Sequence, residues 1–250
     1  GTFSYITGMA VFSVVGVWCG MVCLSLARDL RQQIFGGAAL VAGIACALTS
    51  VSRGPVLIAA VMLIIWLVCS GFWRDKKART LFGALALLAI AVGLDLTSTF
   101  FDLGQGLLLR AESANDSVND RALGQFDETL TAIDLAPFGN GLGTEQVGRS
   151  AYSTGVLANT TFESQWPRIV LELGVIGMLG FVVVSIGALA ALQAAKRRAA
   201  NQGEKAALLA TQLFMVSSFF SNIVFNHVAS AFAWFIFTAV MAALAEERQN

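Results

Sequence analysis

The stretch IVLELGVIGMLGFVVVSIGALAALQAA, residues 169–195, decides the fold class. It contains one charged side chain, Glu172, and is followed directly by the cationic residues 196–198. A helix needs about 20 predominantly apolar residues to cross the hydrocarbon core of a bilayer, so this stretch predicts a transmembrane helix. Similar apolar runs recur on both sides of it, and the chain is 56% hydrophobic and only 13% charged. The sequence therefore predicts an all-α polytopic membrane protein.

The apolar runs predict about seven transmembrane helices and one large polar loop. Residues 1–97 hold the first four helices, residues 98–166 form the loop, and residues 167–250 hold the last three. The predicted spans are Thr7–Ala27, Ile34–Val51, Pro55–Trp73, Leu81–Leu96, Ile169–Ala195, Ala206–Phe225 and Val228–Ala245. Two series of small residues, Gly16 with Gly20 and Gly174 with Gly177 and Gly180, predict close helix packing.

The cations divide unequally between the two sets of connections, and cytoplasmic connections carry the excess of Lys and Arg. The cation-poor set holds Arg53, Arg110, Arg121, Arg149 and Arg168. The richer set holds Arg28, Arg31, Arg74, Lys76, Lys77, Arg79, Lys196, Arg197, Arg198, Lys205 and Arg248. We therefore expect a bacterial inner-membrane protein whose amino end and large loop are extracytoplasmic and whose carboxyl end is cytoplasmic.

The large loop is acidic and is expected to form the working face of the protein. Within it, residues 120–134 predict an amphipathic helix, with Leu123, Phe126, Leu130 and Ile133 on one face. Such a helix can lie on the membrane surface or cover a cavity. The glycines at 139, 141 and 143 follow Pro137 and predict a tight turn rather than a phosphate cradle.

Two arginines on the cation-poor side are candidate anion ligands. Arg53 lies in a very tight turn, Ser52-Arg53-Gly54-Pro55, which places it at the membrane boundary. It either snorkels to lipid headgroups or clamps an anion such as a diphosphate. Arg121 lies in the first turn of the loop helix, where it either forms a surface ion pair or joins free backbone N–H groups in an anion site.

Four further residues are candidates for acid–base or supporting roles. Glu163 precedes the fifth span and is a candidate base or a solvated acid, and Arg168 is placed to pair with it. Glu172 lies within that span and is expected to have a partner. His227, the one histidine, falls in the turn before the last span and is expected to be an interfacial polar residue. The cysteines fit no metal motif and are expected to be small buried residues.

The order of these elements resembles the O-antigen ligase and polymerase-like family. The shared elements are the Ser52-Arg53-Gly54 turn, the loop Arg121 followed by a helix and the P-x-G-x-G-x-G run at 137–143, and a stretch from Glu163 to Glu172 and Gly174. The resemblance implies a GT-C-type membrane glycosyltransferase without a metal or other cofactor. It also implies that further spans precede residue 1, so that the chain is the C-terminal part of a longer protein.

The resemblance also implies roles for individual residues. Arg53 and Arg121 match the arginines that grip the diphosphate of an undecaprenyl-diphosphate-linked glycan donor. Glu163 stands where the lipid A ligases carry a histidine that activates the acceptor hydroxyl. This difference favours a polymerase of O-antigen or exopolysaccharide, or another ligase, in which a carboxylate takes the proton.

The expected reaction is an inverting transfer of glycan to a hydroxyl of a glycan or lipid-linked acceptor. The expected partners are these substrates, the membrane and other polysaccharide export or assembly proteins; the net charge of zero gives no attraction to nucleic acid. Two alternatives remain open, a flippase or transporter of lipid-linked oligosaccharide and a non-catalytic scaffold of an export complex. Transfer of glycan, rather than translocation alone, separates the first expectation from these alternatives.

Overall fold

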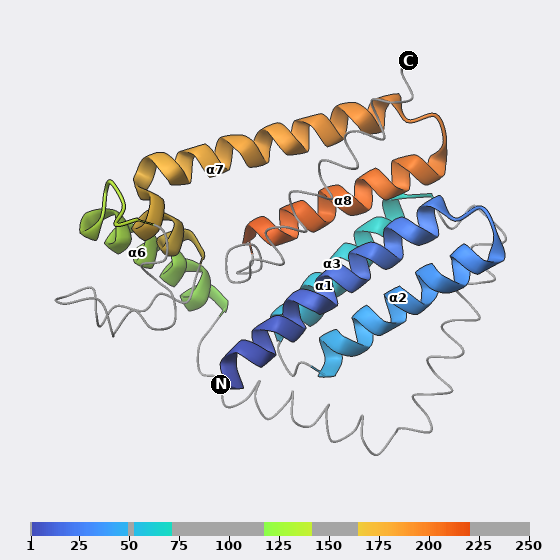
Figure 1. Cartoon of the computed structure of the whole chain (residues 1–250), viewed down its shortest axis with the longest axis horizontal. Helices are drawn as coiled ribbons and strands as arrows, with labels where there is room; N and C mark the ends of the chain where they lie inside the picture. The colour runs from blue at the N-terminus through green and yellow to red at the C-terminus, as the bar shows by residue number, and fades with distance from the viewer. Residues whose placement is uncertain (1, 50–52, 72–117, 142–164, 221–250) are drawn as a thin grey trace.

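The computed structural model describes residues 2–49, 53–71, 118–141 and 165–220, and every regular element within these ranges is an α-helix (Figure 1). The helices are α1 (Thr2–Leu26), α2 (Leu30–Thr49), α3 (Arg53–Cys69), α6 (Val118–Leu135), α7 (Gln165–Arg198) and α8 (Gln202–Phe220).

Five of these helices coincide with predicted spans, and α6 coincides with the predicted amphipathic helix. Among the described residues, α7 and the Leu30–Ala47 part of α2 are long and apolar enough to cross a membrane. Phe12–Leu26 and Pro55–Cys69 are shorter apolar helices. The predicted spans at 81–96 and 228–245 lie outside the described residues. The all-helical membrane class is therefore confirmed, and the number of seven spans stays a prediction.

The helices form a bundle with α6 attached at one end (Figure 1). Helix α1 lies against α2, α3 and α8, and α7 lies against α8 and carries α6 beside its first residues. At the end away from α6, the side-chain amide of Gln202 donates to the Ser70 carbonyl (2.7 Å), and Gly203 contacts the Ser25 carbonyl. The cations of residues 28–31 and 196–198 belong to connections at this same end.

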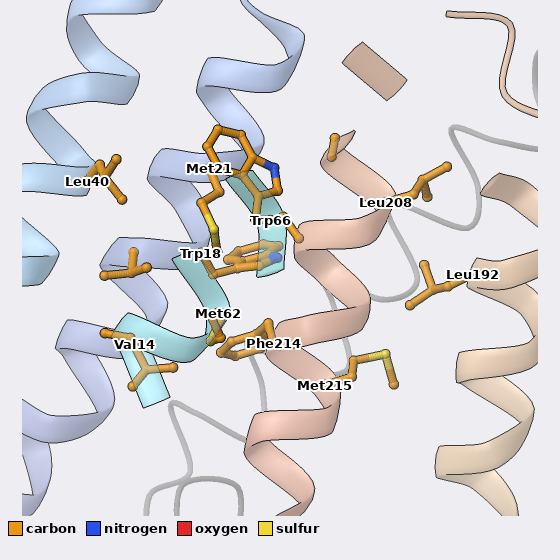
Figure 2. Packing of buried hydrophobic residues seen from close by; sticks show 14 of the residues in the cluster. Val14, Trp18, Met21, Leu40, Met62, Trp66, Leu192, Leu208, Phe214 and Met215 are labelled. Carbon is orange, nitrogen blue, oxygen red and sulfur yellow. The ribbon is translucent and has the colours of Figure 1, made fainter. Parts of the chain in front are cut away.

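The core of the bundle is a set of large side chains between α1, α3 and α8 (Figure 2). The rings of Trp18 and Phe214 have centroids 5.2 Å apart, and Trp66 is fully buried. Both indoles have partners, because Trp18 Nε1 donates to Thr211 Oγ1 (3.3 Å) and Trp66 Nε1 donates to the Ala206 carbonyl (3.2 Å). A buried indole N–H without an acceptor would be costly, so these bonds also fix the rotation of α8.

The first series of small residues packs helix against helix, as predicted. A Cβ atom on Gly16 would lie 3.0 Å from Gly43 Cα, and one on Gly20 would lie 2.6 Å from the Leu40 nitrogen. A Cβ on Gly43 would lie 2.5 Å from the Val17 nitrogen. The backbones of α1 and α2 therefore touch, which only glycine permits.

For the second series, Gly174 interrupts its helix instead of packing against another one, and close helix packing at Gly177 and Gly180 stays a prediction. Gly174 has φ 72° and interrupts α7; among the described residues, the atoms nearest to a Cβ on Gly177 belong to Leu173 of its own helix, and a Cβ on Gly180 would meet nothing within 4 Å. In the sequence, glycines three residues apart in α7 and four residues apart in α1 gave the same kind of signal. Only the position of the neighbouring chain distinguishes a packing glycine from a helix-breaking one.

Candidate functional site: a turn docked into a broken helix

Helix α7 consists of two helical halves joined at Gly174. Gly174 has φ 72° and ψ −176°, which separates residues 165–173 from residues 175–198. In an unbroken helix the carbonyls of Leu171 and Glu172 would accept from the N–H groups of residues 175 and 176. The break frees these carbonyls together with the Val175 N–H, and buried backbone groups need partners.

A turn after α6, residues 137–141, supplies those partners and is called here the docked turn. Asn140 N donates to the Leu171 carbonyl (2.7 Å), and Gly141 N donates to the Glu172 carbonyl (3.1 Å). In return, Val175 N donates to the Pro137 carbonyl (3.0 Å). Three backbone hydrogen bonds thus replace the helical pattern that the break removes.

Two glycines make this close approach possible. Gly139 has φ 80°, and a Cβ atom on it would lie 2.6 Å from the Gly174 nitrogen. A Cβ atom on Gly174 would lie 2.5 Å from the Phe138 carbonyl carbon. Each glycine therefore needs both a positive φ and the absence of a side chain. Two of the motif elements that carried the family resemblance, P-x-G-x-G and E-x-G, fit together as one structural unit.

The turn prediction at 137–141 is confirmed, and the bonds show why this turn is not a phosphate cradle. A cradle needs backbone N–H groups that are free to face an anion. Here the N–H groups of Asn140 and Gly141 already face carbonyls of α7. Gly143 lies outside the described residues.

Helix α6 packs on the first half of α7 through small side chains. Ala132 and Ala136 are buried against Val170 and Leu171, with Ile133 and Met178 at the margin. Of the predicted apolar face, Ile133 lies at the margin of this contact, whereas Phe126 is 70% exposed and Leu130 is 60% exposed. The helix is therefore held by its alanine side, while its larger apolar residues point elsewhere.

The start of α7 is tied to the end of α8 by Gln165, a residue that the sequence did not single out. Its side-chain Nε2 donates to the carbonyls of Phe219 (2.7 Å) and Ser218 (3.3 Å), which are among the last carbonyls of α8. Both partners are acceptors, so the amide orientation is determined, and the buried Oε1 has no hydrogen-bond partner among the residues that the structure describes. The next residue, Trp166, packs edge-on against Phe219, with ring centroids 4.6 Å apart. In the sequence, the one feature that could have identified this anchor was a polar amide side chain shortly before an apolar span.

Both predicted diphosphate ligands belong to the first turns of helices. Arg53 is the first residue of α3, and Arg121 is the fourth residue of α6. The end of α3 that carries Arg53 is opposite the Ser70–Gln202 contact, and α6 lies beside the start of α7 (Figure 1). The structure thus places both backbone positions at the end of the molecule away from the cation-rich connections.

Of the remaining predicted residues, two lie in the described part of the chain and two lie outside it. Arg168 and Glu172 lie one turn apart in the first half of α7, and both are half-buried. Glu163 and His227 lie outside the described residues. Within the described ranges, no group of three or more His, Cys, Asp or Glu side chains is arranged to hold a metal ion.

These features define a helical membrane protein in which one loop helix is docked onto the end of a broken span. The sequence pattern of the O-antigen ligase family matches residues 38–182, which is more than half of the chain. The chain belongs to this family, as its motifs indicated. It is accordingly a membrane enzyme of the O-antigen ligase and polymerase type, which transfers lipid-linked glycans at the inner membrane.

The matched residues contain the Arg53 turn, Arg121, the docked turn, Glu163 and the break in α7, whereas α1, α8 and His227 lie outside the match. A search of curated proteins finds no relative that matches this chain.

Proposed function

We propose that this protein joins a glycan carried on undecaprenyl diphosphate to a hydroxyl of an acceptor glycan or lipid-linked acceptor, with inversion and without a metal. The observation that carries the proposal is the docked turn. It fixes α6, the helix that bears Arg121, to the start of α7, which closely follows Glu163 in the sequence. Helix α3 begins with Arg53 at the same end of the bundle.

Arg53 and Arg121 act as the clamp on the donor diphosphate. Both stand in the first turn of a helix, where unpaired backbone N–H groups and the positive end of the helix dipole favour an anion. A guanidinium adds bidentate hydrogen bonds to phosphate oxygens. The charge that develops on the leaving diphosphate is then stabilised by groups already in place, which is the role a metal ion has in other transferases.

Glu163 acts as the base, and Arg168 and Glu172 support the first half of α7. As the acceptor oxygen attacks the anomeric carbon, the bond from that carbon to the diphosphate oxygen breaks, and the hydroxyl proton passes to Glu163. One displacement inverts the configuration at the anomeric carbon. Because Glu163 precedes Gln165 by two residues, the amide bonds from Gln165 to α8 set the position of the backbone beside the base.

The same arrangement supports the predicted topology. Residues 98–166 form the extracytoplasmic catalytic loop between helices of 1–97 and 167–250, and the cation-rich end of the bundle faces the cytoplasm. The diphosphate of a donor that resides in the outer leaflet would then meet the two arginines at the membrane boundary.

The test is glycan transfer by the purified protein, with any amino-terminal spans that belong to it, in liposomes containing an undecaprenyl-diphosphate-linked oligosaccharide and an acceptor. Arg53→Ala and Arg121→Ala should each abolish transfer while the protein stays folded in the membrane. Arg53→Lys and Arg121→Lys should recover only a small part, because an ammonium keeps the charge but not the bidentate geometry. Arg149→Ala, in the same loop but outside the shared motifs, is the matched control and should retain activity.

Near-normal product from Arg121→Ala would defeat the clamp, and full activity of Glu163→Gln would remove that residue as the base. New glycosidic bonds identify an enzyme, whereas movement of the donor across the bilayer without new bonds would identify a flippase. Retention of the anomeric configuration would contradict a single displacement.

A further inference from the structure

The apolar stripe formed by Phe126 and Leu130 of α6 is largely exposed among the described residues, whereas Ile133 of the same predicted face packs at the margin of the alanine cluster. Phe126 and Leu130 are one helical turn apart, so they lie on one face, and both are largely exposed. The packed face, formed by Ala132 and Ala136, is a different side of the helix. Phe138, in the docked turn, is 86% exposed, the most exposed of the large apolar residues described. Three large apolar side chains in a short segment thus point away from the protein that holds them.

The position of this segment along α7 places it at the edge of a bilayer. The helix from Val175 to Ala195 is about 30 Å long at 1.5 Å per residue, which equals the thickness of the hydrocarbon core. Lys196, Arg197 and Arg198 follow at one end of that helix. Gly174, against which Phe138 packs, therefore lies at the opposite boundary.

The surface of α7 beyond the break is itself apolar and exposed. Ile176 is 75% exposed, and Leu179, Val183 and Ile186 continue this exposed set along the helix. In a membrane-spanning helix such residues face lipid. Phe138 sits at the level where this exposed apolar surface begins, so the exposed apolar residues of α6 extend that surface at one end.

We propose that Phe126, Leu130 and Phe138 form a lipid-binding surface that seats α6 in the headgroup region of the bilayer, with phosphatidyl lipid as the partner. The acidic side chains support this orientation: Asp127 and Asp134 are exposed beside the stripe and stay in water while the rings enter the boundary. Since α6 carries negative charge on this flank, the contact is apolar and requires no anionic headgroup. If the proposed function holds, this surface keeps the start of α6, and therefore Arg121, at the depth of a lipid-borne diphosphate. The lipid contact itself does not depend on glycan transfer and can be tested without it.

The test is photocrosslinking from the full chain in nanodiscs of phosphatidylcholine. Phe126→p-benzoyl-phenylalanine and Phe138→p-benzoyl-phenylalanine should each give an adduct with the mass of the protein plus one lipid. The matched control is Thr131→p-benzoyl-phenylalanine, an exposed position on the acidic side of the same helix, which should give several-fold less lipid adduct. An adduct to another segment of this chain, or equal yields at 126 and 131, would overturn the proposal.

A second measurement does not depend on the crosslinker. Nitroxide labels at positions 126, 130, 127 and 131 are compared in a chain whose free cysteines, Cys19, Cys23, Cys46 and Cys69, are replaced by alanine. Labels at 126 and 130 should be several-fold more accessible to oxygen than to a water-soluble nickel complex, with the reverse at 127 and 131. Equal access to the nickel complex at all four positions, or low access to both reagents at 126 and 130, would overturn the lipid contact.

Discussion

The bundle of α1, α3 and α8 and the junction of α6 with α7 are held together in different ways. In the bundle, interlocking side chains such as Trp18, Trp66 and Phe214 fill a continuous core. At the junction, three backbone hydrogen bonds and a small cluster of alanines and aliphatic residues do the same task. A side-chain core can adjust to many substitutions, whereas a backbone contact between two glycines leaves no room for one additional carbon atom.

This difference agrees with separate roles for the two regions under the proposed function. The bundle anchors the protein in the membrane, and the junction fixes one loop helix in one position relative to one span. A diphosphate clamp built from two separate segments needs that fixed relation, since small displacements of catalytic groups are costly.

The largest effect is expected from Gly139→Ala or Gly174→Ala. A positive φ costs a residue with a Cβ about 1–2 kcal/mol, and forced overpacking costs about 1–3 kcal/mol. The docked turn should therefore lose about 2–5 kcal/mol of stability, because the new Cβ meets backbone. Amide hydrogen exchange at Asn140, Gly141 and Val175 measures the loss directly, and glycan transfer should fall with it.

The control for that pair is Gly124→Ala. Gly124 is a helical residue of α6, and a Cβ on it would meet no described residue within 4 Å. Alanine is favoured over glycine in a helix by about 1 kcal/mol, so this variant should be neutral or more stable. Unchanged exchange in Gly139→Ala would show that the junction does not depend on the glycine contact.

A smaller effect is expected in the bundle from Phe214→Ala. Lipid is as apolar as the protein interior, so removing the ring forfeits packing and leaves a cavity but loses little transfer free energy. We expect a destabilisation of about 2–3 kcal/mol, near the low end for aromatic truncation in cores. Thermal unfolding in detergent measures it, and Val216→Ala, an exposed position on the same helix, should change the midpoint little. Equal shifts for the two variants would argue against a packed core.

The smallest effect is expected from Gln165→Met. This change removes the amide bonds to the α8 carbonyls, worth about 1 kcal/mol net, but also removes the unpaired Oε1. Stability should fall by about 1 kcal/mol or less, while transfer falls further if the amide positions the backbone beside Glu163. Gln193→Met, at an exposed amide pair with Gln212, is the control. Proportional losses of stability and activity would leave Gln165 with a structural role alone.

Much of the fold could be predicted because bilayer crossing leaves a strong local pattern. The apolar runs predicted the positions of α1, α2, α3, α7 and α8 to within a few residues, and the 3.6-residue periodicity predicted α6. Among the described residues, the cations at 28–31 and 196–198 belong to one end of the bundle and the backbone positions of Arg53 and Arg121 to the other, while the rest of the predicted division of Lys and Arg stays a prediction. These properties depend on residues near one another in the chain, so composition and period suffice.

The candidate site was predictable only in part. The loop helix with Arg121 and the turn at Gly139 follow from local chemistry, and the family match confirms the class of enzyme, whereas the predicted turn before Arg53 includes residues 50–52, which lie outside the described residues. The break at Gly174 and the anchoring by Gln165 were missed, because a glycine or an amide near a span has several meanings that differ only in what lies beside it.

The sequence alone determined that this chain is an all-helical membrane protein with a polar segment between apolar runs and a helix that carries Arg121 in its first turn, because these properties depend on neighbouring residues. Only the tertiary structure decided that Gly139 meets Gly174, that α6 packs by its alanines, and that Phe126 and Leu130 remain exposed. Those outcomes depend on the approach of segments more than 30 residues apart, and no local pattern records which backbone will supply the hydrogen bonds that a broken helix lacks.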